Sequence, residues 1–472
     1  MEESEQQMNF EFQQAKKAEK LNSEQPRARP FKDRIEYLRA HNLLVAKNKA
    51  KTNSNVGSVI KKTWITGQRH CCKKPMSELQ PITLSQMKVP MVHTGHYLPC
   101  RVVTTEANVV VATEVFIEDT NGHIEKLSLY NFNCDLDDST WLKAGTILFV
   151  KEPYIKFGSV AHTTMIRVDS PSDVVFVDET NKDLLSQAGV LAWYKPERFT
   201  FEMLKKKANE LFKSGDYEEA LKFYHHALEI HPESEVIHLN MAATLLQLER
   251  FYEAYEEAYK AVRGDLTEDL KDKALFRMGK AAYGMRIWQK AFDHFESLDA
   301  SRLPSAVVEL AKVKSRLHEA TTGKYDLRKI YKKPRQKMQF FDVADYTGPV
   351  KVADIPGKGK GLVVTEDVKK GTLLLVSKAY ALSYDKNEDK TLCVGFNMMT
   401  KTCVSTTQVH VIIETIQKLK KNPQTAKELY SLYAGDLDRD EKISAGVIDA
   451  GRIERICLYN CFGSSFEYDR EK

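Results

Sequence analysis

The sequence has few of the features that would assign it to a secreted, disulfide-rich or metal-binding class of protein. Its 472 residues include eight cysteines, and no two of them form a C-x-x-C pair. Structural zinc sites usually begin with such a pair, so neither a metal site nor a disulfide framework is predicted. We expect reduced thiols.

Long apolar runs and a strong charge excess are missing as well. No apolar run reaches the roughly 18 residues that a membrane span requires. Residues 1–5 are mostly acidic and lack an apolar core, so no secretory signal is expected, and the cytosol or nucleus is the expected location. The net charge is only +5, which does not by itself indicate nucleic-acid binding.

Length and composition favour a protein of about three domains. We predict a multidomain α+β chain that contains a small β-barrel, an α-helical repeat array and a β-rich C-terminal part. Residues 1–80 are rich in Gln, Lys, Arg and Asn. We expect this basic region to be disordered, apart from a short amphipathic helix from Phe31 to Val45.

Residues 87–180 carry five β-rich runs separated by turn signals, which predicts a small OB-like β-barrel. Such barrels often bind oligonucleotides, and nucleic acid is therefore a possible but weaker partner. The alternative, which we prefer, is that aromatic residues in strands form the core. The residues concerned are Phe116, Tyr130, Phe149, Tyr154 and Phe157, with Lys151 and Lys156 nearby.

Residues 198–322 contain three copies of a helix-pair repeat, followed by a capping helix. The first copy has Ala208, Gly215, Tyr217, Ala220, Tyr224, Ala227 and Pro232; its frame returns 34 residues later at Ala242, Ala254, Ala258 and Ala261, and then at Gly279, Ala291, Phe295 and Leu298. Small residues suit close helix crossings, and a proline ends a helix. The pattern resembles a tetratricopeptide repeat (TPR) array.

Within the TPR family, the array resembles the modules that hold the Glu-Glu-Val-Asp tail of cytosolic heat-shock chaperones. A five-residue clamp in those modules surrounds the terminal carboxylates. The matching residues are Lys205, Asn209, Asn240, Lys273 and Arg277. Positions i and i+4 share one helix face and can converge on an anion. The alternative is a merely solvated helix face, but five matches in register favour the clamp.

A basic linker over residues 323–345 leads into residues 346–472. There Pro356-Gly357-Lys358-Gly359-Lys360-Gly361-Leu362 follows a strand that begins at Val350. The glycines do not open a helix, so a dinucleotide-binding turn is not indicated. The order of the segments resembles the opening of SET domains, which are protein-lysine methyltransferases that use S-adenosylmethionine. We interpret Gln408 to Tyr433 as a helical insert and Arg452 to Gly463 as the helix that returns to the core.

The resemblance to SET domains implies a cofactor site. The residues that would line the amino-acid end and ribose of S-adenosylmethionine are Lys358, Gly359, Lys360, Gly361 and Leu362. The family also uses an Asn-His-Ser-Cys type motif and a tyrosine near the end of the domain, and neither is found before Lys472. We therefore expect a partial SET domain without assigned catalytic residues and without methyl transfer.

Two main hypotheses follow. The chain is a TPR-containing SET protein of the type common in fungi, or it is a non-catalytic adaptor that holds chaperone tails.

Overall fold

The computed structural model describes residues 2–52, 59–65, 69–109, 112–132, 141–158, 163–196, 198–264, 266–332, 341–383, 391–398, 401–436 and 442–462. The chain divides into two units, Met1–Glu197 with Ala381–Lys472, and Arg198–Tyr380. Residues 346–472, which we expected to form one domain, are thus divided between the units. Among the described residues, no helix combines the length and hydrophobicity needed to cross a membrane.

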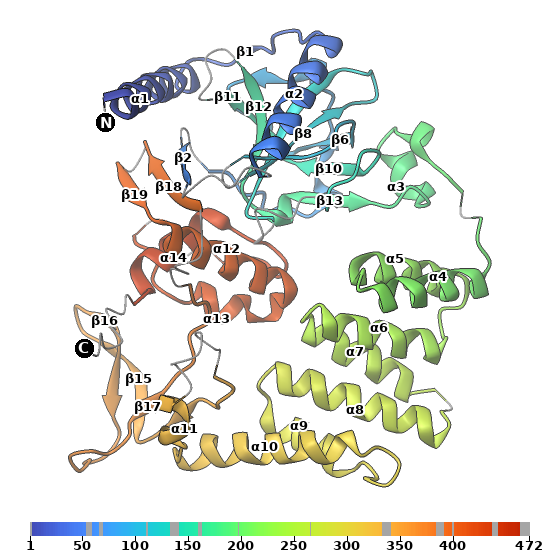
Figure 1. Ribbon diagram of the computed structural model, residues 1–472, viewed down its shortest axis with the longest axis vertical. Coiled ribbons are helices and arrows are strands. Elements are labelled where there is room, and N and C mark those ends of the chain that lie inside the picture. The colour runs from blue at the N-terminus through green and yellow to red at the C-terminus, as the bar shows by residue number, and fades with distance from the viewer. Residues whose placement is uncertain are drawn as a thin grey trace. The chain divides into compact units, whose positions relative to one another are not determined.

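A ten-stranded sheet forms the centre of the first unit (Figure 1). Its strands are β3 (Gln80–Pro81), β5 (Met91–Val92), β6 (His96–Val102), β7 (Ala107–Val109), β8 (Ala112–Glu118), β9 (Ile124–Tyr130), β10 (Ile147–Lys151), β11 (Tyr154–Phe157), β12 (Thr164–Val168) and β13 (Val174–Val177). The main path runs β13-β10-β6-β8-β9-β12-β11-β5, and among the described strands of this sheet only β9 with β12 and β3 with β6 are parallel pairs. The described pairings do not close this path, so the OB-like barrel stays a prediction.

Several aromatic residues of the sheet are buried. Phe149 is 0% exposed, and Phe116 and Phe157 are also buried. Lys151 and Lys156 are buried too, and burial lowers the pKa of Lys156 to about 7. A surface on which bases stack needs exposed rings. These residues therefore form the packed interior rather than a nucleic-acid platform.

The N-terminal region differs from the expected disorder. It forms α1 (Glu2–Asn22), β1 (Arg27–Ala28), α2 (Arg34–Thr52) and β2 (Val59–Ile65). The ammonium of Lys32 pairs with Glu125 on β9, and Arg29 Nη1 lies 3.1 Å from the same carboxylate. In α2, Ile35 is 62% exposed, so this helix does not bury the apolar face that the sequence suggested. The basic segment before α2 is instead held by buried ion pairs, which composition does not reveal.

Small strand pairings and a helical module complete the first unit. β2 pairs in parallel with β18 (Thr391–Asn397), which pairs with β19 (Thr402–Val404), while β1 pairs with β4 (Lys88–Val89). A helical module of α12 (Thr406–Lys421), α13 (Ala426–Tyr430) and α14 (Ala450–Asn460) has its own apolar core. It joins the sheet through Ser172 Oγ, which accepts the Ile448 amide at 3.0 Å. The short helix α3 (Lys182–Gln187) follows β13.

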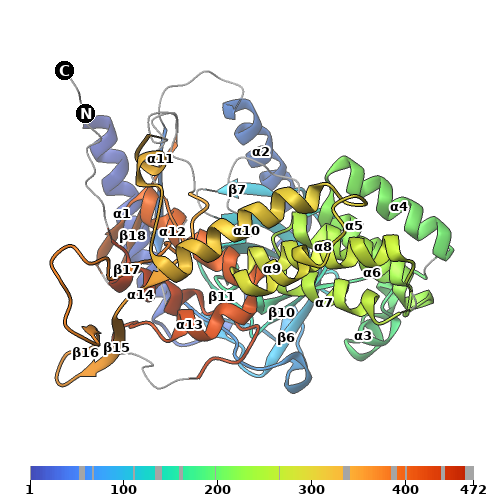
Figure 2. The ribbon, with the colours of Figure 1, turned by 90° about the horizontal axis from the view of Figure 1, so that it is seen from below.

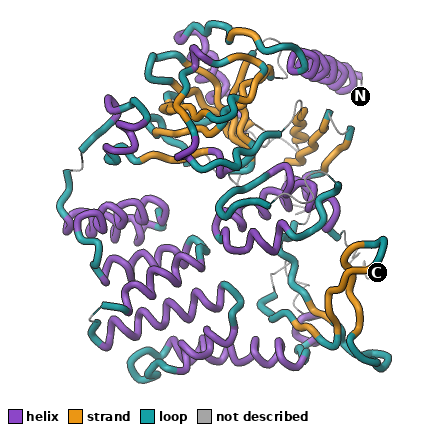
Figure 3. The backbone as a smooth tube through the Cα atoms, turned by 180° about the vertical axis from the view of Figure 1, so that it is seen from behind, coloured by secondary structure: helices purple, strands orange, loops and turns teal. Residues whose placement is uncertain are grey.

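The second unit contains the repeat array, which is helical throughout and joined by short loops (Figure 3). Its helices are α4 (Phe201–Ser214), α5 (Tyr217–Ile230), α6 (Glu235–Gln247), α7 (Phe251–Val262), α8 (Glu268–Gly284), α9 (Trp288–Glu296) and α10 (Ser305–Thr322). The Thr200 hydroxyl caps α4 by accepting the Met203 amide, and Gly215 ends α4 at φ +85°. Ala208 and Ala220 are 0% exposed, as expected for close helix crossings. α10, which the sequence suggested as a cap, packs along α9 (Figure 2).

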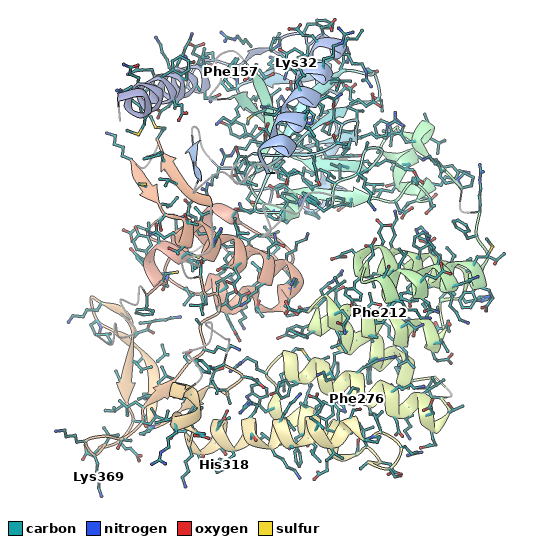
Figure 4. All side chains as sticks on the ribbon, in the orientation of Figure 1. Lys32, Phe157, Phe212, Phe276, His318 and Lys369 are labelled. Carbon is teal, nitrogen blue, oxygen red and sulfur yellow. The ribbon has the colours of Figure 1, made fainter. Side chains whose placement is uncertain are left out.

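The remainder of the second unit is α11 (Leu327–Lys332), β14 (Tyr346–Thr347), β15 (Val350–Ile355), β16 (Gly359–Val364) and β17 (Leu375–Val376). β15 and β16 form an antiparallel hairpin, and β14 pairs with β17. The segment before β14 is tied to the array, because Asp342 accepts a hydrogen bond from the Tyr283 hydroxyl at 2.7 Å. Lys369 lies in the loop between β16 and β17 (Figure 4).

His238 gives the array a pH-dependent contact. Its Nδ1 lies 2.6 Å from a carboxylate oxygen of Glu257, and this hydrogen bond raises the pKa of His238 above its ordinary value. A raised pKa means that the contribution is fully present below the ordinary value near 6.5 and is lost as pH rises through the folded-state value. We expect wild type to exceed a His238→Gln variant in Tm by a few degrees at about pH 6 and by less at about pH 8. Calorimetry of both proteins checks this, and an equal difference at both pH values would contradict it.

Candidate functional site

The five polar residues that the sequence singled out lie on α4, α6 and α8 of the array. Lys205 and Asn209 are one helical turn apart, so they share a face. Both are half-buried. Lys205 Nζ lies 3.2 Å from an oxygen of Glu202 in an exposed pair, which contributes little to stability and leaves the lysine able to exchange partners.

The two asparagines meet between α4 and α6. Asn240 Nδ2 donates to Asn209 Oδ1 at 3.2 Å. The same oxygen accepts a hydrogen bond from the hydroxyl of Tyr224, on α5, at 2.6 Å. Tyr224 is 2% exposed, and burial raises its pKa to about 12, so this hydroxyl stays neutral and can donate.

The remaining two residues come from α8. Lys273 and Arg277 line one cavity of about 570 Å³, together with the apolar side chains of Leu246, Phe251 and Phe276. Phe276 lies within the stacked helices of the array (Figure 4). The cavity thus combines cationic side chains with an apolar wall, as binding pockets commonly do.

Arg277 differs from the other two clamp cations in its counter-ions. It is half-buried, and burial lowers its pKa from the ordinary value while Tyr224 opposes that shift. Within the described part of the chain, no carboxylate lies within salt-bridge distance of its guanidinium. Lys273, by contrast, pairs with Asp269 at 2.6 Å on the exposed side of α8. A half-buried guanidinium without a counter-ion is ready to bind a carboxylate.

The five residues therefore differ in how closely the structure brings them together. Asn209 and Asn240 are in direct contact, the charge of Arg277 opposes the rise in the pKa of Tyr224, and Lys273 shares a cavity with Arg277. Lys205 shares the α4 face with Asn209. Amide donors and cations on one face can bind an anion such as a peptide carboxylate.

Sequence reasoning missed two parts of this site. Tyr224 was identified only as a packing residue of the repeat, and its contact with Asn209 was not foreseen. The apolar wall of Phe251 and Phe276 was also missed. A signal was available for the tyrosine, because a hydroxyl that is buried in a helix crossing needs a polar partner.

The glycine-rich segment forms the tip of the β15–β16 hairpin. Gly357 and Gly359 have φ near +72° and +76°, which the turn requires, and the amide of Lys358 donates to the Ile355 carbonyl at 2.9 Å. Among the residues expected to line S-adenosylmethionine, Lys358, Gly359 and Lys360 are exposed, Leu362 is 50% exposed and Gly361 is half-buried. A nucleoside cofactor needs a concave site that covers most of its surface. This exposed hairpin does not by itself fit the cofactor.

Comparison with known proteins supports the assignment of the repeats. The tetratricopeptide repeat family model matches residues 211–263, and the TPR prediction is confirmed there. A protein named "Methyltransferase" from Gibberella zeae is 26% identical over 83% of this chain and 55% of its own length. "Stress-induced-phosphoprotein 1" from Caenorhabditis elegans is 35% identical over 22% of this chain and 32% of its own length.

Two further similarities are confined to short parts of the chain. "Hsp70-Hsp90 organising protein" from Plasmodium falciparum is 35% identical over 18% of this chain and 32% of its own length. A solved structure, "First TPR of Spaghetti (RPAP3) bound to HSP90 peptide SRMEEVD", is 28% identical over 25% of this chain and 92% of that chain, with a TM-score of 0.23. The chain spans about half the length of the Gibberella relative and about a third of the other two proteins.

Proposed function

We propose that the repeat array is a receptor for the acidic C-terminal tails of partner proteins, of the Glu-Glu-Val-Asp class carried by cytosolic chaperones. The main observation behind this proposal is the half-buried guanidinium of Arg277, which lacks a carboxylate partner in the described part of the chain. Its charge also opposes the rise in the pKa of Tyr224, whose hydroxyl donates a hydrogen bond to Asn209. Lys205, Asn240 and Lys273 complete the clamp. The partners are thus proteins, recognised through a free terminal carboxylate.

Relatives support this choice of ligand. Two proteins that resemble the array are named for stress induction or for organising Hsp70 and Hsp90. We infer that the array of this chain takes tails of the same chemistry. Because cations dominate the clamp, the attraction should weaken as salt is added.

Calorimetric titration of the full chain tests the receptor proposal. The two probes are a peptide ending in Glu-Glu-Val-Asp with a free C-terminus and the same peptide as its C-terminal amide. We expect the free acid to bind at least about tenfold more tightly, because hydrogen bonds to charged groups contribute about 1.5–3 kcal/mol each. Equal binding of both peptides, or binding of neither, would overturn the proposal.

A second candidate function concerns the whole chain. We infer that the chain is of the TPR-containing SET type, related to S-adenosylmethionine-dependent protein-lysine methyltransferases. The supporting observation is the similarity to the Gibberella methyltransferase along 83% of this chain, together with the Gly357–Leu362 turn. The array would then bring acidic-tailed proteins to the enzyme. The protein substrate would be a lysine-bearing partner.

The cofactor part of this proposal has its own measurement. Because the described hairpin residues are exposed, we expect little or no retention of radiolabelled S-adenosylmethionine by this chain in equilibrium dialysis. If saturable binding is found and is lost in Gly361→Arg, the hairpin holds the cofactor in this chain and our expectation is wrong. Binding that Gly361→Arg leaves unchanged would contradict the assignment of Lys358 to Leu362.

A further inference from the structure

The hydroxyl of Tyr224 decides which atoms of the Asn209 side chain are free. Asn209 Oδ1 accepts one hydrogen bond from this hydroxyl at 2.6 Å and another from Asn240 Nδ2 at 3.2 Å. An amide oxygen has two lone pairs, so both are in use. The side chain of Asn209 can therefore offer a ligand only the N–H donors of its Nδ2.

Helix packing does not require this hydroxyl. The repeat frame places Ala258 and Phe295 at the positions that correspond to Tyr224 in the second and third copies. Both are buried, at 0% and 1% exposed, and neither carries a hydroxyl. A ring or a methyl group thus suffices for the crossing. At this position of the repeat, a hydroxyl occurs only in the first copy, where it contacts Asn209.

We propose that Tyr224 is a positioning residue of the anion site, a role that rests on the proposed function of the array. Its hydroxyl holds the Asn209 amide with Nδ2 turned toward the terminal carboxylate of an acidic peptide. Without the hydroxyl, only the longer hydrogen bond of 3.2 Å from Asn240 Nδ2 holds the amide, which can then turn more easily and present Oδ1, and this oxygen repels a carboxylate. Tyr224 itself need not touch the peptide.

Tyr224→Phe tests this role, because it removes one oxygen and keeps the ring. We expect the free-acid Glu-Glu-Val-Asp peptide to bind about three- to tenfold more weakly, which corresponds to one hydrogen bond. Binding of the C-terminal amide should change less, so the preference for the free acid should fall. A general loss of structure would weaken both peptides equally, and that result would overturn the positioning role.

Tyr255→Phe is the matched control. It also removes a tyrosine hydroxyl from the array, one that lies 3.1 Å from His294 Nε2, but none of its described contacts involves the anion site. We expect wild-type peptide affinity in this variant. An equal loss of affinity in Tyr255→Phe and Tyr224→Phe would overturn the specific role of Tyr224.

A double-mutant cycle separates the positioning role from the receptor function. In an Asn209→Ala background, Tyr224→Phe should have no further effect on free-acid binding, because its target is gone. If Tyr224→Phe weakens free-acid binding by the same factor in both backgrounds, the positioning role is wrong while the receptor function stands. If wild type itself shows no preference for the free acid, the receptor function falls, and the positioning role falls with it.

Discussion

Arg277→Ala is expected to weaken binding of a free-acid Glu-Glu-Val-Asp peptide by at least about thirtyfold. Removing one partner of a hydrogen-bonded charge pair costs about 2–5 kcal/mol when the pair is buried, and the half-buried guanidinium should lie at the lower end. The double variant Lys273→Ala/Arg277→Ala should abolish measurable binding, since the cavity then keeps neither clamp cation. Calorimetric titration gives the affinities, and circular dichroism checks that helicity is intact.

Lys280→Ala is the control for net charge. Lys280 lies on the same helix and lines the same cavity, but its ammonium is 3.3 Å from Glu309. A rim charge acts mainly on the association rate, so we expect a loss of less than about threefold. If Lys280→Ala weakens binding as much as Arg277→Ala, the peptide responds to overall charge, and the assignment of Arg277 to the clamp is wrong.

Glu125→Gln should destabilise the first unit by about 3–5 kcal/mol, because it leaves buried cations without their counter-ion. Glu125 is 0% exposed, and its carboxylate pairs with both Lys32 and Arg29. In calorimetry of the full chain, the transition of this unit should fall by on the order of 10 °C. Trypsin should also cleave sooner after Lys32, because the segment loses its anchor.

The pH dependence of the Glu125→Gln variant follows from Lys32. Burial lowers the pKa of Lys32, so in this segment the unfolded chain binds more protons than the folded one, and stability rises with pH. Raising the pH should therefore restore part of the stability that the variant has lost. Glu24→Gln serves as the control, because its pair with Arg27 is exposed and should contribute less than about 1 kcal/mol. Equal effects of the two substitutions would mean that the N-terminal segment is not held by Glu125.

The repeat array shows which features could be predicted from the sequence. Ala208 and Ala220 recur in a fixed frame, and each helix pair packs mainly on its neighbours, so local pattern and tertiary structure agree. The clamp candidates could be predicted from the sequence for the same reason, since residues four apart must share a helix face. The role of Tyr224 could not be predicted, because the identity of its partner depends on how α4, α5 and α6 cross.

The rest of the chain depends on contacts between distant segments. The pairing of β2 with β18 and of Lys32 with Glu125 joins residues far apart in sequence, and composition carries no signal for such pairs. The expectation of N-terminal disorder differed from the structure for this reason. The sequence by itself determined the helix pairs and the residues on their faces, because these follow from local periodicity. Only the tertiary structure decided that the basic segment docks on the sheet and that the glycine-rich hairpin is exposed, because burial depends on what the rest of the chain places against a segment.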